Sequence, residues 1–193
     1  MSIATIWLPL IIGLLIVIIA LWRRMLTVDG AFAALLVGGT MLSFGGLPFV
    51  IPLLTFFVTA SLLSKVSNRT KKNASQHFAK SDQRDAVQVF ANAGLGMAAA
   101  LAMWFTDNAL WFTFFIGVMA TANADTWATE LGTLSKSPPL SIVTGKPLAA
   151  GTSGGVSLLG LGASAAGGLL IGLSAALVGG GEIGNQLAIG GIS

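Results

Sequence analysis

Long apolar runs recur along this chain and constrain its fold more than any other feature. The first run, 3–21, is followed directly by Trp22, Arg23 and Arg24. A run of this length can cross ~30 Å of bilayer hydrocarbon as a helix. Because the positive charge follows the run and no small-residue cleavage site is seen, we expect a retained transmembrane helix and not a cleaved signal peptide.

Further apolar runs predict more membrane helices of the same kind. They cover 31–44, 47–63, 87–105, the segment that starts at Ala109, and 156–178. The second run contains Gly38 and Gly39, so we expect a thin or broken helix there. Residues 179–182 are expected to form an outer turn, and 185–193 to begin a further segment that is too short to span a membrane. The predicted fold class is all-α, a polytopic helical membrane protein of about six transmembrane helices in one domain, 1–193.

The distribution of positive charge predicts the orientation of these helices. With the N-terminus outside, all ten Lys and Arg residues fall on the inner side, most of them in the basic loop 65–86. We therefore expect a multi-pass protein of the plasma (inner) membrane with its polar loops and active face in the cytoplasm. The loop residues 65–72 are expected to set topology and contact anionic membrane lipids.

Composition excludes several classes of function. The chain is 54% hydrophobic and only 9% charged, with a net charge of +3. Since the basic residues lie between apolar runs, nucleic acid is not an expected partner. There is no cysteine and a single histidine, His77, so any metal site must use oxygen ligands.

A polar ladder leads into the run 87–105. Lys80, Arg84, Gln88, Asn92 and Gly96 follow one another at intervals of four, so on one helix they would share a face. A face of this kind avoids lipid and serves either as a contact between helices or as a substrate site. We favour a substrate site, because guanidinium is the usual bidentate partner of phosphate.

The carboxylates of the stretch 122–155 are the second candidate feature. Asp125 and Glu130 are expected near the inner end of the fifth helix, together with Asn123 and Thr126. Carboxylates at such a depth are costly, so we expect catalysis or ion binding. Five residues separate the two acids by about 140° around a helix, so sharing one metal requires the helix to unwind near Asn123; otherwise each pairs with other groups. Asp29 is expected to be either a ligand or a helix-start carboxylate.

The third candidate feature is a glycine-rich turn with two nearby cations. Lys136 and Lys146 precede the turn Gly151-Thr152-Ser153-Gly154-Gly155, which is expected to end where the sixth helix begins. Backbone N–H groups and a helix N-terminus favour anions there. The lysine precedes the glycines, so this is not a Walker A sequence. Cations, acids and a helix N-terminus on one face are what a metal–polyphosphate complex requires.

A stripe of small residues in the sixth run predicts close helix packing. It consists of Gly160, Ser164, Gly168, Gly172 and Ala176 at intervals of four. We read this stripe as a packing surface, because small side chains let another helix approach closely. A homo-oligomer is compatible with the same surface.

Three blocks of sequence resemble the signature blocks of one integral-membrane family. They are 84–92 (RDAVQVFAN), 123–132 (NADTWATELG) and 151–157 (GTSGGVS). The family was formerly labelled domain of unknown function 92 and includes the plant phytyl-phosphate kinase and the animal transmembrane protein 19. Family members continue with a further glycine-serine and aspartate-serine block in a last span, which this chain does not contain before Ser193. A carboxylate of that block is an expected second metal ligand.

The resemblance implies phosphoryl transfer from a nucleoside triphosphate, expected to be CTP, to an isoprenyl monophosphate such as phytyl or geranylgeranyl phosphate. Arg84, Lys136 and Lys146 would neutralise phosphates, the turn 151–155 would cradle the donor, and Asp125 with Glu130 would bind Mg²⁺. No general base is needed, because the acceptor phosphate is already anionic. Three alternatives stay open, namely a transporter or flippase for an anionic lipid or metabolite, a cytidylyltransferase acting on a lipid phosphate, and a non-catalytic scaffold.

Overall fold

Six helices and one short two-stranded ribbon make up the part of the chain that the structure, a computed structural model, describes: residues 3–72, 83–149, 152 and 154–190. The helices are α1 (Ile3–Trp22), α2 (Val28–Gly45), α3 (Leu47–Lys72), α4 (Ala86–Thr106), α5 (Leu110–Gly132) and α6 (Leu158–Gly190); the strands are β1 (Leu140–Ser141) and β2 (Gly155–Val156). The predicted all-α class is confirmed.

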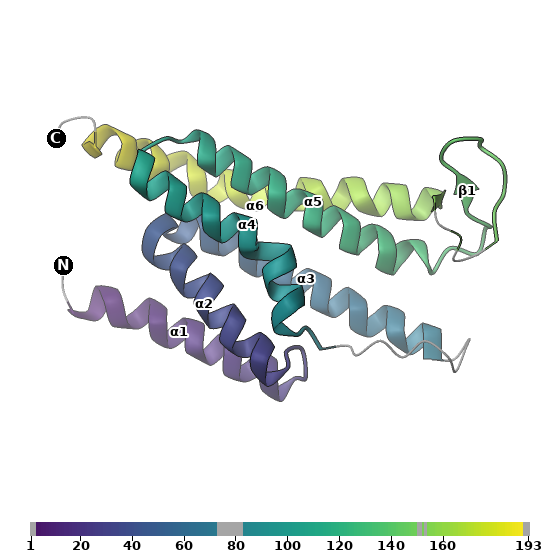
Figure 1. Cartoon of the computed structure of the whole chain (residues 1–193), viewed down its shortest axis with the longest axis horizontal. Coiled ribbons are helices and arrows are strands. Elements are labelled where there is room, and N and C mark those ends of the chain that lie inside the picture. Colours follow the sequence, from purple (N-terminus) through teal and green to yellow (C-terminus); the bar gives the residue numbers. More distant parts are fainter. Residues whose placement is uncertain (1–2, 73–82, 150–151, 153, 191–193) are drawn as a thin grey trace.

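The helices form two groups that overlap along only part of their length (Figure 1). α3, α5 and α6 extend to the end of the molecule that carries the β1–β2 ribbon, whereas α1, α2 and α4 lie beside the other half. The most extensive packing joins α5 to α6 and α2 to α4. The N-terminal end of α1 and the C-terminal end of α6 lie at the same end of the molecule, opposite the ribbon.

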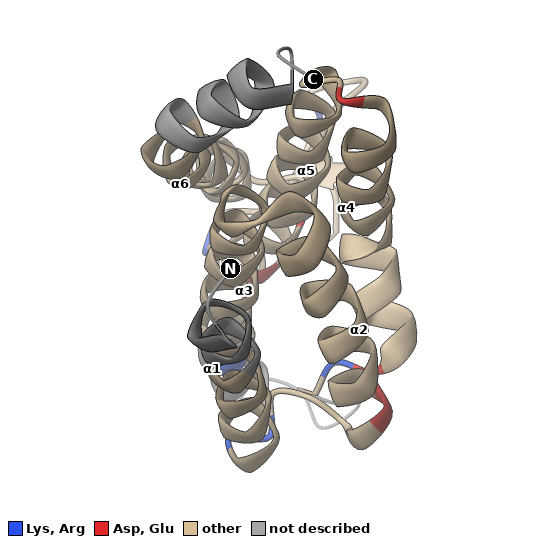
Figure 2. Ribbon diagram, turned by 90° about the vertical axis from the view of Figure 1, so that its left-hand side faces the viewer, with Lys and Arg blue, Asp and Glu red and all other residues tan. Residues whose placement is uncertain are grey.

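Four of the described helices are long and apolar enough to cross a membrane: α2, α3 up to Lys65, α4, and α6 up to Gly179. α1 has 20 residues, Ile3–Trp22, and coincides with the apolar run predicted from the sequence. Charged residues occupy only a few places on the bundle in the end-on view of Figure 2. α5 is not among these four helices. Its second half carries the polar residues Asn123, Asp125 and Glu130.

Two local predictions were wrong. α2 is continuous through Gly38 and Gly39, and α6 runs through residues 179–182 to Gly190 without the predicted outer turn or a separate final segment. The physical reason is the same in both helices. In a membrane, leaving backbone N–H and C=O groups unpaired costs more than the low helix propensity of glycine, so glycines do not interrupt the helix.

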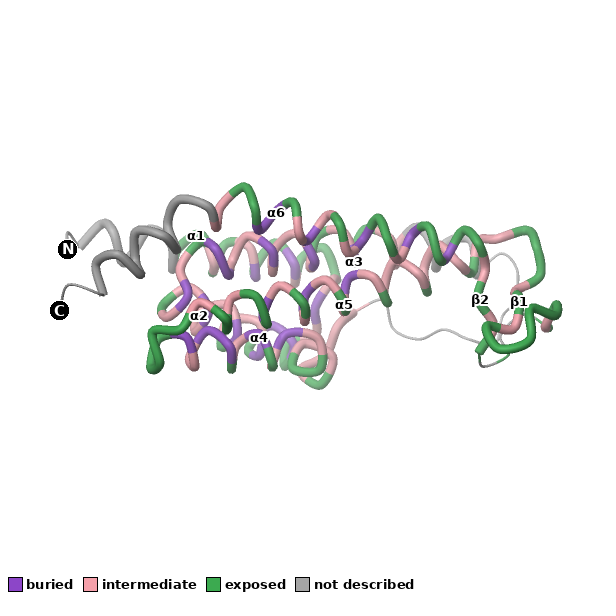
Figure 3. Tube along the Cα trace, turned by 90° about the horizontal axis from the view of Figure 1, so that it is seen from above, coloured by how far each residue is buried: buried purple, intermediate pink, exposed green. Residues whose placement is uncertain are grey.

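The core lies where α2, α3, α4 and α5 meet, and the residues near the ribbon are largely exposed (Figure 3). Phe49 stacks on Phe115 with ring centroids 4.4 Å apart. Gly96 of α4 lies against this pair's edge, since an added Cβ would come within 2.8 Å of Met41 Cε and 3.0 Å of the Phe115 ring. The ladder glycine therefore allows close packing of α2, α4 and α5.

The small-residue stripe of α6 is only partly used for packing. Gly160 fits against α5, because its added Cβ would lie 3.2 Å from both Ala128 O and Gly132 Cα. Gly167, outside the predicted stripe, makes a similar contact with Asn123 O at 3.2 Å. Gly172 has no atom within 4 Å of its added Cβ. The buried row of α6 is Ala163, Gly167, Ile171 and Ala175, which keeps the interval of four but lies one residue before the predicted stripe.

Candidate functional site

Arg84 lies just before α4 and is held by backbone pairing with the segment between α1 and α2. Its N–H donates to Met25 O at 2.9 Å, and its carbonyl accepts the N–H of Thr27 at 3.1 Å. The Thr27 hydroxyl donates to the same carbonyl at 3.2 Å. This short parallel bridge between Leu26 and Arg84 joins segments that are distant in sequence. It fixes the backbone from which the Arg84 side chain extends.

The predicted helical ladder is therefore wrong at its start. α4 begins at Ala86, so Arg84 precedes the helix, and only Gln88, Asn92 and Gly96 lie on it. Lys80 lies outside the described residues. Asp85 caps the start of α4, because its carboxylate accepts the N–H of Gln88 at 2.8 Å.

Asp29 is a helix-start carboxylate, one of its two predicted roles, and it also contacts the start of a second helix. It lies in the first turn of α2, and its carboxylate accepts the N–H of Ala86 at 3.0 Å, at the N-terminus of α4. α2 itself is capped by Thr27, whose hydroxyl accepts the N–H of Gly30 at 3.2 Å. The starts of α2 and α4 are thus tied together beside Arg84.

The Arg84 side chain extends toward α3. Its Nη1 donates to the hydroxyl of Ser61, and its Cζ lies 5.5 Å from the Phe56 ring centroid and 5.8 Å from that of Phe57. Both distances are within the range of cation–π attraction. Two aromatic faces and a hydroxyl therefore hold the guanidinium in place.

Glu130 supplies the opposite charge. Its carboxylate accepts the Ser64 hydroxyl at 2.8 Å. Burial lowers the pKa of the Arg84 guanidinium below its ordinary value, and the negative charge of Glu130 opposes that shift. Because the ordinary pKa of arginine lies far above neutrality, the group stays protonated. Arg84 and Glu130 thus bond to hydroxyls three residues apart on α3, Ser61 and Ser64, and lie within electrostatic range of each other.

A cavity of about 350 Å³ lies between α1, α2, α3 and α4 and reaches Arg84. Figure 2 shows the arrangement of these four helices in the end-on view. Arg84 and Asn92 are the polar side chains of its lining, which is otherwise apolar. The lining extends from Leu26, just before α2, to Leu47, just after it. α3 lines the cavity from Leu47 to Phe57, a stretch of about 15 Å at 1.5 Å per residue. Such a long apolar cavity with a cation at one end fits an amphiphile with an anionic head.

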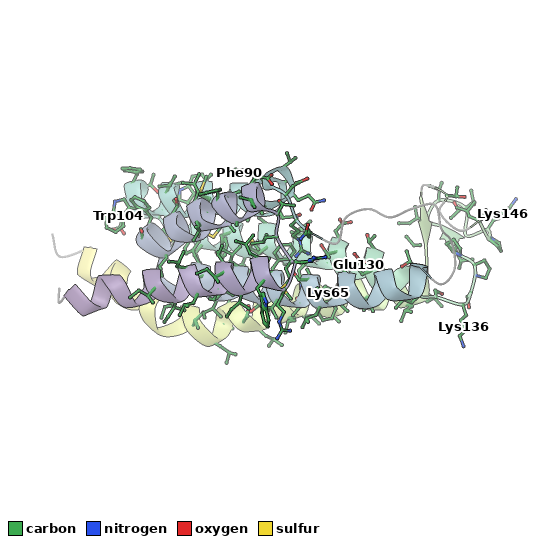
Figure 4. The ribbon with its side chains drawn as sticks, turned by 90° about the horizontal axis from the view of Figure 1, so that it is seen from below. Lys65, Phe90, Trp104, Glu130, Lys136 and Lys146 are labelled. Carbon is green, nitrogen blue, oxygen red and sulfur yellow. The ribbon has the colours of Figure 1, made fainter. Side chains whose placement is uncertain are left out.

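The predicted lysines do not lie near Arg84. Lys136 and Lys146 are exposed at the end that carries the β1–β2 ribbon, whereas Glu130 lies much nearer the middle of the molecule (Figure 4). The positive-inside rule places charges on one side of a membrane but does not bring them into one site. Their role in binding phosphate stays a prediction.

The glycine-rich turn does not lead directly into α6. Gly155 belongs to β2, which pairs with β1, and Ser157 caps α6 by accepting the N–H of Gly160 at 3.1 Å. Thr152 and Gly154 are exposed, and Gly151 and Ser153 lie outside the described residues. The turn therefore ends close to the start of α6, as predicted, but the hydroxyl that caps the helix is that of Ser157.

Asp125 and Glu130 do not form a shared magnesium site in this arrangement. α5 is an unbroken helix from Leu110 to Gly132, so the unwinding that sharing an ion requires does not occur. Asp125 is exposed, and Glu130 faces Ser64. Among the described residues, no three His, Cys, Asp or Glu side chains are grouped to hold a metal ion. These residues do not fit the predicted pairwise coordination.

Two other predicted residues of α5 donate hydrogen bonds to the backbone carbonyls of helices. Thr126 donates its hydroxyl to Ala122 O, one turn earlier in its own helix, at 2.9 Å. Asn123 is fully buried, and its Nδ2 donates to Gly167 O of α6 at 2.7 Å. Thr59 of α3 lies 3.4 Å from the Asn123 amide oxygen. Asn123 thus joins three helices at their contact.

Replacing Asn123 by alanine is expected to destabilise the protein by about 1 kcal/mol, because the buried hydrogen bond to Gly167 is lost. Thermal unfolding in detergent, followed by tryptophan fluorescence, measures this change. Thr121→Ala is the matched control, since the exposed Thr121 hydroxyl bonds only its own helix, at Gly117 O. Equal unfolding temperatures for the two variants would contradict the role of Asn123.

Sequence reasoning missed the residues of α3 that surround Arg84. Phe56, Phe57 and Ser61 lie within the run 47–63, which reads as a plain apolar span. One signal was available: hydroxyl residues recur there at Thr55, Thr59 and Ser61. Such residues in a membrane helix mark a face toward other helices.

Comparison with known proteins gives a family match. Residues 11–192 match the family model described as Integral membrane protein DUF92. The chain is 36% identical over 161 residues to Protein PGR of Arabidopsis thaliana, covering 76% of this chain and 55% of that protein. It is 32% identical over 147 residues to Uncharacterized membrane protein MJ0933 of Methanocaldococcus jannaschii, covering 75% of this chain and 59% of that protein. The chain thus spans little more than half the length of these relatives. No solved structure matches it.

Proposed function

This chain belongs to the integral membrane protein family DUF92, and we propose that it transfers a phosphoryl group from a nucleoside triphosphate, preferably CTP, to an isoprenyl monophosphate. Phytyl and geranylgeranyl phosphate are the proposed acceptors. The observation that carries the proposal is the position of Arg84 in an otherwise apolar cavity. An isoprenyl chain matches the apolar lining, and a phosphate head matches the guanidinium.

Arg84 suits the acceptor phosphate because it is charged and its surroundings hold it in place. The rings of Phe56 and Phe57 and the Ser61 hydroxyl restrict the side chain, so little conformational entropy remains to be lost on binding. Glu130 provides partial charge compensation before the ligand arrives. We assign Arg84 the role of orienting the acceptor phosphate at the end of the cavity.

In the proposed reaction an oxygen of the acceptor phosphate attacks the terminal phosphorus of the triphosphate. A bond forms between these two atoms, the bond to the bridging oxygen breaks, and the nucleoside diphosphate leaves with that oxygen. The attacking oxygen is already anionic, so no proton has to be removed. The donor would arrive from the predicted cytoplasmic side, where Lys136, Lys146 and the turn 151–155 are proposed contacts of the nucleotide alone.

The test uses the purified full chain in lipid nanodiscs with CTP, Mg²⁺ and geranylgeranyl phosphate, with products identified by mass. CDP together with geranylgeranyl diphosphate is the expected result. Release of pyrophosphate would instead indicate cytidylyl transfer and overturn the kinase proposal. Geranylgeraniol serves as a control substrate; it lacks the phosphate that Arg84 would orient, so we expect no phosphorylation. Absence of product over a panel of lipid phosphates and nucleotides would also overturn the proposal.

A further inference from the structure

Three glycines line the cavity and leave space in front of their own Cα atoms. Gly13 of α1 and Gly39 of α2 have no atom within 4 Å of an added Cβ, and Gly38 meets only Leu53 Cδ2 at 3.9 Å. A side chain at any of these positions would therefore enter open space. Ordinary helix packing does not require glycine at these three positions.

Other glycines of the same helices lack this space. At Gly30 an added Cβ would lie 2.2 Å from Arg84 O, and at Gly45 it would lie 2.4 Å from Phe49 Cδ2. Those two glycines are required because a backbone or a buried ring lies against them. The cavity glycines differ, since their small size keeps volume open.

The cavity glycines lie beyond the Arg84 guanidinium along the helix axes, at the level of the first half of α3. Gly38 and Gly39 come eight and nine residues after Gly30, which touches the Arg84 backbone. At 1.5 Å per residue, they lie about 12 to 14 Å farther along α2. Gly13 precedes Arg23 by ten residues, which is about 15 Å along α1. Measured from the guanidinium the separation is shorter, because Gly38 contacts Leu53, four residues before Phe57, whose ring flanks the guanidinium; this is about 6 Å along α3. These positions on two helices therefore bound the part of the cavity that begins about one helical turn beyond the cation.

We propose that Gly13, Gly38 and Gly39 determine the length of hydrocarbon chain that the cavity accepts. This inference rests on the proposed function for the position of the anionic head at Arg84. With the head fixed there, the distal part of the tail must pass the level of these glycines. A larger side chain at that level takes the volume of the terminal methylenes. Each excluded methylene weakens binding about fourfold.

The test compares Gly39→Leu and Gly13→Leu with the natural chain, using geranyl, farnesyl and geranylgeranyl phosphate. Native mass spectrometry measures binding of each lipid to the full chain, and the CTP assay measures turnover. We expect each variant to lose at least tenfold in affinity for geranylgeranyl phosphate and to keep its affinity for geranyl phosphate within about threefold. The matched control is Gly117→Leu, because Gly117 is exposed on α5, has equal space and does not line the cavity.

Binding and turnover separate failure of this inference from failure of the proposed function. A shifted length preference in binding supports the role of the glycines even where no phosphoryl transfer is measured. An unchanged length preference in both variants, with intact binding, overturns it even where the enzyme is active. An equal shift in Gly117→Leu would also overturn it, since the effect would then be a general result of adding leucine to a membrane helix.

Discussion

Replacing Arg84 by glutamine is expected to lower kcat/KM for geranylgeranyl phosphate by about 100- to 1,000-fold, the usual loss when one fixed donor to a reacting oxyanion is removed. Glutamine keeps the apolar stem of the side chain but is two bonds shorter, so it also loses the contact with the Ser61 hydroxyl. It removes the positive charge and the planar pair of donors that matches a phosphate. The CTP assay measures the loss, and lipid binding is expected to fall with it.

Two further variants give this prediction its controls. Arg84→Lys keeps the charge but not the fork of donors, so we expect an intermediate loss of about tenfold. Arg23→Gln is the matched control, because the exposed Arg23 stacks on Trp22 at 5.2 Å and does not line the cavity. We expect its kcat/KM to stay within about twofold of the natural value. An Arg84→Gln protein as active as Arg23→Gln would exclude Arg84 from the site.

The helices could be predicted from the sequence because apolar length is a local property. The six helices and the start of α3 after Gly46 follow from runs that are long enough to span a bilayer. The break expected in α2 was wrong, because soluble-protein rules for glycine were applied where water is absent. Backbone pairing within the helix decides the outcome there.

The position of Arg84 could not be predicted from local pattern. The interval of four from Lys80 to Gly96 suggested a single helix. Arg84 instead pairs with Leu26 and Thr27, and the helix begins only at Ala86. That pairing joins residues 58 positions apart. Periodicity carries no information on contacts at such separations, so Arg84 was selected correctly for its chemistry and placed wrongly in its element.

The distance between Arg84 and the lysines was also beyond sequence reasoning. Charge distribution assigns Lys136 and Lys146 to the same predicted side as Arg84. It does not show that α5 and α6 continue past the ends of α1 and α2 and carry the ribbon away from them (Figure 1). The cavity was missed for a similar reason, since its lining comes from four helices, each of which reads separately as an ordinary apolar span.

Gly30 is the position where the backbone around Arg84 has least room. An added Cβ would lie 2.2 Å from Arg84 O and 3.0 Å from the Thr27 hydroxyl. The first contact is with backbone that is already held by the Thr27 N–H, so it cannot be relieved by turning a side chain. Any side chain at Gly30 must separate the start of α2 from the segment before α4.

Replacing Gly30 by alanine is therefore expected to destabilise the protein by about 2 kcal/mol. Overpacking of this kind costs up to about 3 kcal/mol, and the better helix propensity of alanine returns at most about 1 kcal/mol. Because Arg84 shifts with its backbone, kcat/KM should also fall by about tenfold or more, since a displacement of about 1 Å at a site can cost 100-fold. Tryptophan fluorescence during thermal unfolding and the CTP assay measure the two effects.

Gly94→Ala provides the matched control, because its added Cβ meets the Phe90 ring at an ordinary 3.8 Å. The same substitution in the interior of α4 is expected to leave stability unchanged or slightly raised. If Gly30→Ala unfolds at the same temperature as Gly94→Ala, the close contact with Arg84 O is not a constraint in the protein. If Gly30→Ala is destabilised but keeps full activity toward geranylgeranyl phosphate, the α1–α2 segment stabilises the bundle without positioning Arg84. Loss of both together, with lipid binding weakened in proportion to kcat/KM, is the result expected of a backbone contact that positions the cation.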